Sequence, residues 1–196
     1  AQILTYAINI TNLKEAEKRE RELYLKMQHQ QEEMFRILND APIAIVIRRG
    51  PELKVEYANQ TALNYTSFDQ QELLGTSAEY FHAKLKTNYD TSGLMDVFRS
   101  GKALKGQAQN VKYDRYGTNE LAEGWFDYVW EPTFDESGNV NGVATFTFDV
   151  SDLIRANQEL TKNEKRFRFI ADAIPHKMWT SGPNGTATYY NKGWTE

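Results

Sequence analysis

The most constraining feature of this 196-residue chain is an internal repeat. The stretch from Phe35 to Pro42 recurs from Phe167 to Pro175, and the sequence Tyr57–Asn59 recurs as Tyr189–Asn191. Both recurrences have the same offset in the numbering, 132 (167 − 35 and 191 − 59), with one extra residue before Pro175. This period is too long for a solenoid unit and has the length of a small domain. The repeat therefore predicts a tandem array of similar modules.

A second echo defines where the modules end. Residues 8–13 are similar to residues 148–153, at an offset of 140 (149 − 9). We therefore expect residues 1–10 to form the last strand of a preceding module and residues 35–150 to form one complete module. Residues 171–196 are expected to begin a following module, truncated before its core can close.

Two segments without glycine or proline, residues 11–34 and 151–170, are predicted to be linker helices. In the first, alternating steps of three and four residues trace a heptad seam with polar interruptions. The seam positions are Leu13, Ala16, Glu20, Leu23, Met27, Gln30, Met34 and Ile37. The pattern is weak for an isolated coiled coil and sufficient for a homodimer joined through the linker helices.

Composition narrows the classes of partner. Hydrophobic residues make up 40% of the chain, which is enough for a core, and the net charge of −4 favours neither nucleic acid nor an anionic membrane. The absence of cysteine excludes disulfides, thiolate metal sites and thiol nucleophiles. The absence of cysteine also favours a cytoplasmic location. Because no apolar run approaches about 20 residues, we expect no membrane contact here, with any membrane anchor of a longer parent protein lying elsewhere.

Between the linkers, the pattern predicts two strands, a run of short helices, a longer helix from about Lys86 to Arg99, and three further strands. Asn59 follows the second strand and is expected to cap the first short helix. The expected strands cover residues 43–48, 54–59, 104–114, 123–134 and 139–150.

This order of elements resembles the PAS sensory domain. The resemblance rests on motifs spread over the whole middle module: Phe35–Pro42, Tyr57–Asn59, Glu72–Gly75, Gly101, Pro132, Gly138, Gly142 and Asp149–Asp152. It implies an α+β fold, in which a five-stranded antiparallel sheet carries helices on one face and encloses a small cavity. It also implies neighbouring PAS and output domains in a multidomain signalling protein, most often a bacterial sensor histidine kinase. The chain shows no nucleotide-binding motif or recognisable phosphoacceptor histidine, so we expect no enzyme within this fragment.

The resemblance also bears on cofactors. His29, His82 and His176 are far apart and lack metal-ligand spacing, so we interpret them as ordinary side chains and expect no metal site and no catalytic residues. Haem-binding PAS domains use a histidine on the longer helix, which has none here, and haem is therefore disfavoured. Without cysteine, the cysteinyl-flavin photochemistry of light-sensing relatives is excluded. No cofactor is predicted, and a noncovalent small ligand remains open.

An aromatic strand is the most suggestive stretch for ligand contact. Alternation places Phe126, Tyr128 and Trp130 on one face, which the resemblance directs toward the helices and cavity. If a ligand binds, Tyr128 and Trp130 would offer it polar atoms, and Met95 or Phe98 from the longer helix would form the opposite wall. The alternative, which we favour, is that these rings simply fill the core.

The step from the last strand into the second linker helix is expected to couple the sheet to that helix. Ser151 is predicted to cap the helix, and Asp149 to anchor the corner through a hydrogen bond. The same residues would then transmit a change in the sheet.

Three functions follow from these features. The first is a PAS module that detects a small ligand or mediates dimerisation, and relays the change through its flanking helices. The second is a small-molecule-binding domain or enzyme whose cavity chemistry uses Tyr128, Asp127 and nearby carboxylates. The third is a structural spacer and dimerisation unit.

Overall fold

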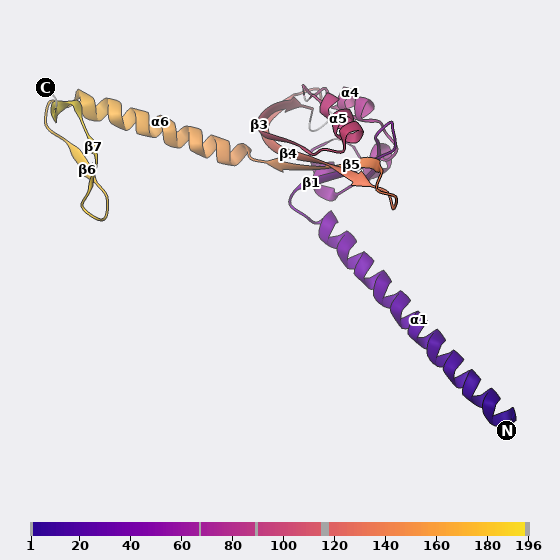
Figure 1. The fold of residues 1–196 in the computed structure, drawn as a ribbon. Helices are drawn as coiled ribbons and strands as arrows, with labels where there is room; N and C mark the ends of the chain where they lie inside the picture. The colour runs from indigo at the N-terminus through magenta and orange to yellow at the C-terminus, as the bar shows by residue number, and fades with distance from the viewer. Residues whose placement is uncertain (1, 67, 89, 115–117, 195–196) are drawn as a thin grey trace.

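A computed structural model describes residues 2–66, 68–88, 90–114 and 118–194 of the protein. Figure 1 shows a sheet-and-helix core from which two long helices project. Helix α1 (Gln2–Asn39) leads into the core, and helix α6 (Ser151–Ala173) leaves it. The two predicted linker helices are therefore present, and both are longer than expected.

The expected strand over residues 1–10 is wrong, because α1 already begins at Gln2. The isoleucines of this stretch and Thr5 favour strands, but that preference depends on a neighbouring strand. No strand of the described sheets pairs with residues 2–10. A helix instead satisfies the backbone groups within the segment itself. Whether a preceding module supplies a partner strand stays a prediction.

The core is a five-stranded antiparallel sheet in the order β2-β1-β5-β4-β3, so the predicted α+β fold is confirmed. Its strands are β1 (Ala44–Arg49), β2 (Lys54–Ala58), β3 (Leu104–Tyr113), β4 (Ala122–Phe134) and β5 (Val140–Asp149). The central strand β5 pairs with the first strand on one side and with β4 on the other. Thr145 consequently lies opposite Val46 in β1 and Trp130 in β4.

Four short helices lie between β2 and β3 and pack against the sheet (Figure 1). They are α2 (Gln60–Asn64), α3 (Gln70–Leu73), α4 (Ala78–Leu85) and α5 (Ser92–Ser100). The most enclosed core side chains come from both layers: Leu73, Val97 and Val143 are each at most 1% exposed. Burial of the apolar surface between the layers is the main force that holds helices and sheet together.

The helix expected from Lys86 to Arg99 begins later than predicted, at Ser92. Lys86 instead ends α4 in a left-handed conformation, with φ of 49°. Asp90 then accepts a hydrogen bond from the Ser92 amide at 2.9 Å, which supports the new helix start. The amide and hydroxyl of Ser92 also lower the pKa of Asp90. At the other end, the predicted stop at Gly101 is confirmed, with φ of 64°.

Asn59 joins the end of α1, the start of β1 and the start of α2. Its amide nitrogen donates to the carbonyls of Leu38 at 3.1 Å and Ile43 at 2.8 Å. Its oxygen accepts from the backbone amides of Ile45 at 2.9 Å and Ala62 at 3.0 Å. The predicted cap is confirmed, and the side chain, which is 0% exposed, also fixes the corner through which the chain enters the sheet.

Asn191 repeats this arrangement at the end of α6. Its amide nitrogen donates to the carbonyls of Ala171 at 2.8 Å and His176 at 2.9 Å, and its oxygen accepts from the Met178 amide at 2.8 Å. These partners have an offset of 133 from their counterparts at the first corner (171 − 38, 176 − 43 and 178 − 45). The asparagines themselves have an offset of 132 (191 − 59), as do Phe35 and Phe167 (167 − 35). The extra residue therefore lies in the helix end, between Phe167 and Ala171.

An aromatic pair accompanies each asparagine. Phe35 on α1 meets Tyr57 edge to face, with ring centroids 5.6 Å apart, and Phe167 on α6 meets Tyr189 in the same way at 5.6 Å. Such pairs add about 0.5–1.5 kcal/mol beyond the burial of their area. A ring contact and an asparagine thus help to hold the C-terminal end of each long helix to the strands that follow it.

The C-terminal segment forms the predicted strand, turn and strand. Strands β6 (Trp179–Ser181) and β7 (Ala187–Tyr190) pair antiparallel, and the 3-10 helix η1 (Lys192–Trp194) follows. This hairpin lies at the far end of α6, away from the core (Figure 1). All three residues of β6 are exposed. Its identity as the start of a second PAS-like module stays a prediction.

Within the described part of the chain, no helix combines the length and the hydrophobicity that a membrane crossing needs.

Candidate functional site

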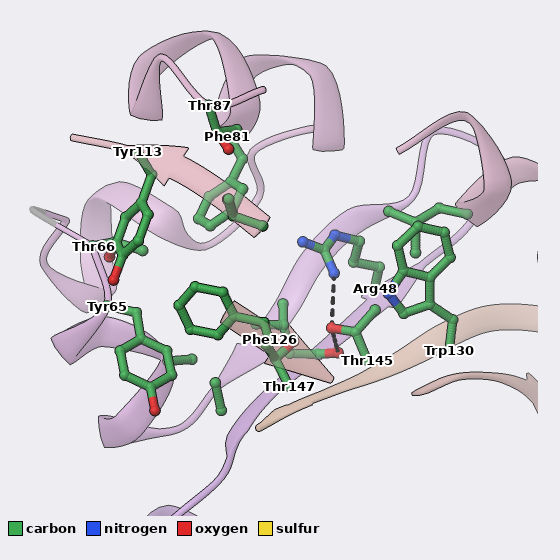
Figure 2. A pocket seen from close by; sticks show the side chains of 15 residues that line it. Arg48, Tyr65, Thr66, Phe81, Thr87, Tyr113, Phe126, Trp130, Thr145 and Thr147 are labelled. Carbon is green, nitrogen blue, oxygen red and sulfur yellow. Dashed lines mark hydrogen bonds between the residues drawn. The ribbon is translucent and has the colours of Figure 1, made fainter. Parts of the chain in front are cut away.

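A cavity of about 130 Å³ lies between the sheet and the short helices. Figure 2 shows the side chains around it. The described lining consists of Ala44, Val46, Arg48, Ala62, Tyr65, Thr66, Phe81, Thr87, Leu94, Val111, Tyr113, Phe126, Trp130, Thr145 and Thr147. Most of these side chains are apolar or aromatic, and the polar ones are hydroxyl groups and one guanidinium. This composition is typical of a small-molecule site.

Strand alternation brings residues of four strands to this cavity. Phe126 and Trp130 of β4 both line it, as do Val111 and Tyr113 of β3. The Phe126 ring lies at the centre of an aromatic group, 5.7 Å from the ring of Tyr65 and 5.7 Å from that of Tyr113. The sequence-predicted face of β4 therefore points into the domain, and Phe126 and Trp130 stay candidates for ligand contact.

The described lining does not include the other three pocket candidates, Met95, Phe98 and Tyr128. All three are partly buried and pack against a core cluster beside Trp130. On α5, Leu94 lines the cavity instead.

Tyr128 packs against its neighbours in the sheet. Its ring stacks on Trp130 with centroids 4.6 Å apart. The ring also covers Gly106, its partner across β3, so closely that a Cβ on this glycine would lie 2.1 Å from the ring. A glycine opposite an aromatic ring lets the ring lie flat over the backbone. Tyr128 therefore has a packing role in this structure.

Asp127 has a structural role in the strand pairing. Its carboxylate accepts a hydrogen bond from the Ala108 amide at 2.7 Å, where the pairing of β3 with β4 shifts between Gly106 and Gln109. Alternation places Asp127 on the opposite face of β4 from Tyr128 and from the cavity. The enzyme hypothesis joined these two side chains in one pocket, and the structure separates them.

Arg48 is the charged residue of the cavity lining, and sequence reasoning missed it. It is 3% exposed and lies on β1, two residues after Val46, so the same strand face carries both into the cavity. Its Nη1 donates to Thr145 Oγ1 at 3.2 Å (Figure 2), and its guanidinium carbon lies 5.8 Å from the Phe81 ring centroid. The signal was present in the sequence: alternation through the apolar run Ala44–Ile47 predicts an inward side chain at position 48.

The corner between β5 and α6 is held differently from the prediction. Ser151 is the first residue of α6, and its hydroxyl makes no capping bond. Instead, Ser151 Oγ accepts from the Trp125 amide of β4 at 2.9 Å, and the Val150 amide donates to the Trp125 carbonyl at 2.9 Å. A serine at the first helical position is already part of the helix, so its side chain is free to bond the neighbouring strand.

Asp149 anchors this corner through a backbone hydrogen bond, as predicted. One of its carboxylate oxygens accepts from the Ser151 amide at 2.9 Å. A carboxylate at the start of a helix also interacts favourably with the helix dipole. The first turn of α6 is thus tied to two strands, to β5 through Asp149 and to β4 through Ser151.

No group of three or more metal-binding side chains occurs among the described residues. His29 lies on α1, His82 lies in α4 and His176 follows α6, so the three backbone positions are widely separated.

Comparison with known proteins identifies the fold family. A family model of the PAS domain matches residues 42–152, which is more than half of the chain. The chain therefore belongs to the PAS domain family. A search of curated proteins found no match.

Solved structures that are similar to this chain include a light-oxygen-voltage receptor and two PAS domains. An RNA-binding light-oxygen-voltage receptor aligns with a TM-score of 0.52 at 19% identity, over 69% of this chain and 37% of its own. The PAS domain of nitrogen regulation protein NR(II) from Vibrio parahaemolyticus has a TM-score of 0.43 at 16% identity, over 58% of this chain and 94% of its own. The PAS domain of BvgS from Bordetella pertussis has a TM-score of 0.43 at 16% identity, over 68% and 98%. At these identities the likeness concerns the fold, and the chain spans about 37% of the receptor.

Proposed function

We propose that this PAS domain senses a small ligand in its cavity and relays occupancy to α6 through the corner at Asp149 and Ser151. One observation carries the proposal. Phe126 lines the cavity, and the backbone of its neighbour Trp125 exchanges hydrogen bonds with Val150 and Ser151 at the start of α6. A displacement of β4 by a ligand against Phe126 would therefore reach α6 within one residue.

The size of the cavity supports a small ligand over a large cofactor. About 130 Å³ is below the roughly 300 Å³ at which sites for drug-sized molecules begin. The described lining contains no histidine, and neither does the sequence of α5, so these residues offer no ligand to a haem iron. We propose no cofactor for this domain.

Substitution of Asp149 tests the relay. Asp149→Ala removes the carboxylate that accepts from the Ser151 amide, while the cavity is left unchanged. The expected result is a larger effect on the signalling output of the full-length parent protein than on ligand binding by this chain. Asp152→Ala is the matched control, since Asp152 is exposed and bonds only Arg155 of the same helix among its described contacts, at 2.8 Å. Equal effects of Asp149→Ala on output and on binding would contradict the relay.

We also propose that the chain forms a homodimer through α1. Apolar side chains of its heptad seam are more than half exposed, for example Leu23 at 62% and Met27 at 56%. Burial of such side chains between two helices is the usual stabilising contribution in a coiled coil. Light scattering of chains with and without residues 11–34 tests this: the shorter chain is expected to be monomeric. The spacer hypothesis would be favoured if both chains dimerised and no compound bound the cavity.

The parent protein is proposed to be a multidomain signalling protein with a cytoplasmic sensory part, in which a second PAS-like module begins near residue 171. The repeated asparagine corner at Asn191 supports this module. By the family resemblance, the output domain is expected to be a histidine kinase. The complete reading frame tests both statements, because it must encode further PAS strands after residue 196 and a kinase domain beyond them.

A further inference from the structure

Gly124 of β4 lies between two features described above, the cavity and the start of α6. The residue is buried, and Phe126 of the cavity lining follows it by two positions on the same strand face. A Cβ on Gly124 would lie 2.8 Å from Cε2 of Phe126 and 3.2 Å from Oγ of Ser151. The ring of Phe126 and the hydroxyl of Ser151 therefore border the same small space beside the strand.

The glycine lets the Phe126 ring lie against the backbone of its own strand. A glycine within a strand often marks such a close approach. The ring also meets the rings of Tyr65 and Tyr113 edge to face, at centroid distances of 5.7 Å each. Because protein interiors are close-packed, they transmit displacement from one group to the next. A push on this ring from the cavity therefore reaches the backbone at Gly124.

Ser151 carries the contact into α6. It is the first residue of that helix and is 4% exposed. Its Oγ accepts from the Trp125 amide at 2.9 Å, and its own amide donates to Asp149 at 2.9 Å. A displacement beside Gly124 therefore acts directly on the residue that ties α6 to both strands.

We propose that Gly124 is a positioning residue of the relay. The Phe126 ring passes pressure from the cavity to Ser151 through contact at Gly124, and the hydrogen bond between Ser151 and the Trp125 amide weakens. The inference rests on the proposed sensory function and names the side-chain contact with which the relay begins. It holds for a ligand of any charge, because it depends only on contact with the ring.

A larger side chain in the cavity tests the contact with no ligand added. Thr147 lines the cavity on β5 and lies opposite Tyr128, which places it diagonal to Phe126 in the strand register (Figure 2). Thr147→Leu adds bulk on the cavity side of the ring. In hydrogen exchange, the Trp125 amide is expected to lose about 3-fold or more of its protection. The Asn59 amide, which donates to the Ile45 carbonyl at 3.0 Å, is the reference and should keep its protection.

Substitution of the glycine tests its role. The methyl group of Gly124→Ala is expected to push the ring and the hydroxyl apart, so that the Trp125 amide loses about 10-fold of its protection. Gly93→Ala on α5 is the matched control, because its Cβ would lie 2.9 Å from Cζ3 of Trp130, another ring of the cavity lining. This control is expected to keep the protection of the Trp125 amide. An equal loss in both variants would refute the role of Gly124.

Removal of the ring separates the contact from a general loss of stability. In a Phe126→Leu background, the methyl group of Gly124→Ala has the space that the ring occupied. Gly124→Ala is then expected to change the protection of the Trp125 amide by less than about 2-fold, whereas independent effects would add. A loss as large as that in the presence of the ring would overturn the proposal.

Thr147→Leu serves alone if Gly124→Ala does not fold, and it is then compared with and without Phe126→Leu. The loss of protection at the Trp125 amide is expected only when the ring is present, and an equal loss without the ring would contradict the contact. The two proposals fail separately. Unchanged Trp125 protection in Thr147→Leu and Gly124→Ala overturns this contact and leaves the sensor in place. The expected losses, together with no effect of Asp149→Ala on output, overturn only the relay to the parent protein.

Discussion

The two asparagine corners have the same local geometry in very different surroundings. At the first corner, Asn59 is followed by a complete five-stranded sheet, four helices and an internal cavity. At the second, Asn191 makes the same kinds of hydrogen bond, but the adjoining strands form only a two-stranded hairpin, and β6 is exposed. The corner therefore depends on one short stretch of local sequence, whereas the cavity depends on strands far apart in the chain.

The difference shows which parts of the module are encoded locally. A helix end, a short turn and an asparagine are enough to position the first hairpin relative to its helix. An isolated two-stranded hairpin is only marginally stable in water. The first corner should thus be part of the cooperative core, and the second should open independently of it.

The largest contrast is expected for the two asparagines themselves. Asn59→Ala leaves several buried backbone groups without partners, each costing about 1–3 kcal/mol, and should lower the free energy of unfolding by about 3 kcal/mol or more. Asn191→Ala should change the unfolding of the core by less than about 0.5 kcal/mol. Urea denaturation measures both values.

Hydrogen exchange locates the effect of the second substitution. In Asn191→Ala, the Met178 amide loses its acceptor and is expected to lose its protection, while amides of β5 keep theirs. If Asn191→Ala destabilised the core as much as Asn59→Ala, the two corners would belong to one cooperative unit, and the comparison would fail.

The aromatic pairs should show a smaller contrast. Phe35→Ala removes the ring contact with Tyr57 and is expected to destabilise the core by about 0.5–1.5 kcal/mol. Phe167→Ala removes the equivalent contact with Tyr189 and should leave core unfolding unchanged while loosening the hairpin. Differential calorimetry compares the two variants, and identical shifts of the main transition would contradict the expectation.

Removal of the two tyrosine hydroxyls should have opposite effects. The Tyr57 hydroxyl is enclosed without a hydrogen-bond partner among the described residues, and desolvation, followed by the charge of Asp40, raises its pKa. Tyr57→Phe should therefore stabilise the core by up to about 1 kcal/mol. The Tyr189 hydroxyl donates to Asp172 at 2.9 Å, so Tyr189→Phe should reduce hydrogen-exchange protection in the hairpin. Destabilisation of the core by Tyr57→Phe would show that its hydroxyl has a partner.

The smallest effect is expected when the pH is lowered, and it concerns the hydrogen bonds of Asp172 at the second corner. The Lys192 amide, and then the Tyr189 hydroxyl, lower the pKa of Asp172 by hydrogen bonding its carboxylate. Because the pKa of Asp172 is lower in the folded chain than in the unfolded chain, its stabilising contribution is fully present above the unfolded-state pKa of about 3.9. This contribution is lost as the pH falls through the folded-state pKa. Protection of the Lys192 amide should decrease over this range below about pH 4.

Asp172→Asn is the control, because it removes the titrating group and should abolish the pH step. The structurally equivalent residue of the first corner is Asn39 (172 − 133), which does not ionise, so the first corner should lack this step. Nuclear magnetic resonance titration follows both corners in one sample. A step of equal size at both would rule out Asp172 as its origin.

The sequence predicted those features that repeat or alternate. Strand alternation placed Phe126 and Trp130 on one face, turn residues defined the strands, and the repeat paired Tyr57–Asn59 with Tyr189–Asn191, which lie at the two corners. The five-stranded antiparallel sheet was predicted through the family resemblance, because strand order depends on contacts between distant segments that a local pattern does not contain.

The errors have physical causes of a single kind. Residues 1–10 and the start of the helix expected from Lys86 were assigned from propensity, but no strand of the described sheets pairs with residues 2–10, and α5 begins at Ser92, whose amide donates to Asp90. Arg48 was missed because a charged residue near the end of an apolar strand is usually solvated. Its burial depends on Thr145, far along the chain in β5, and local sequence gives no sign of that contact.

The extra residue at the second corner indicates how such linkers can be adjusted. Asn59 donates to the carbonyl of Leu38, and Asn191 donates to the carbonyl of Ala171. Phe35 lies three positions before Leu38, and Phe167 lies four positions before Ala171 (38 − 35 and 171 − 167). Positions three and four further along share one side of a helix, so with either spacing the ring can contact the tyrosine while the carbonyl accepts from the asparagine. Each added residue nevertheless turns the upstream helix by about 100°. Insertion of a single residue at this position would therefore rotate the part of the chain that precedes it about the helix axis, while the contacts of the asparagine and the tyrosine are kept.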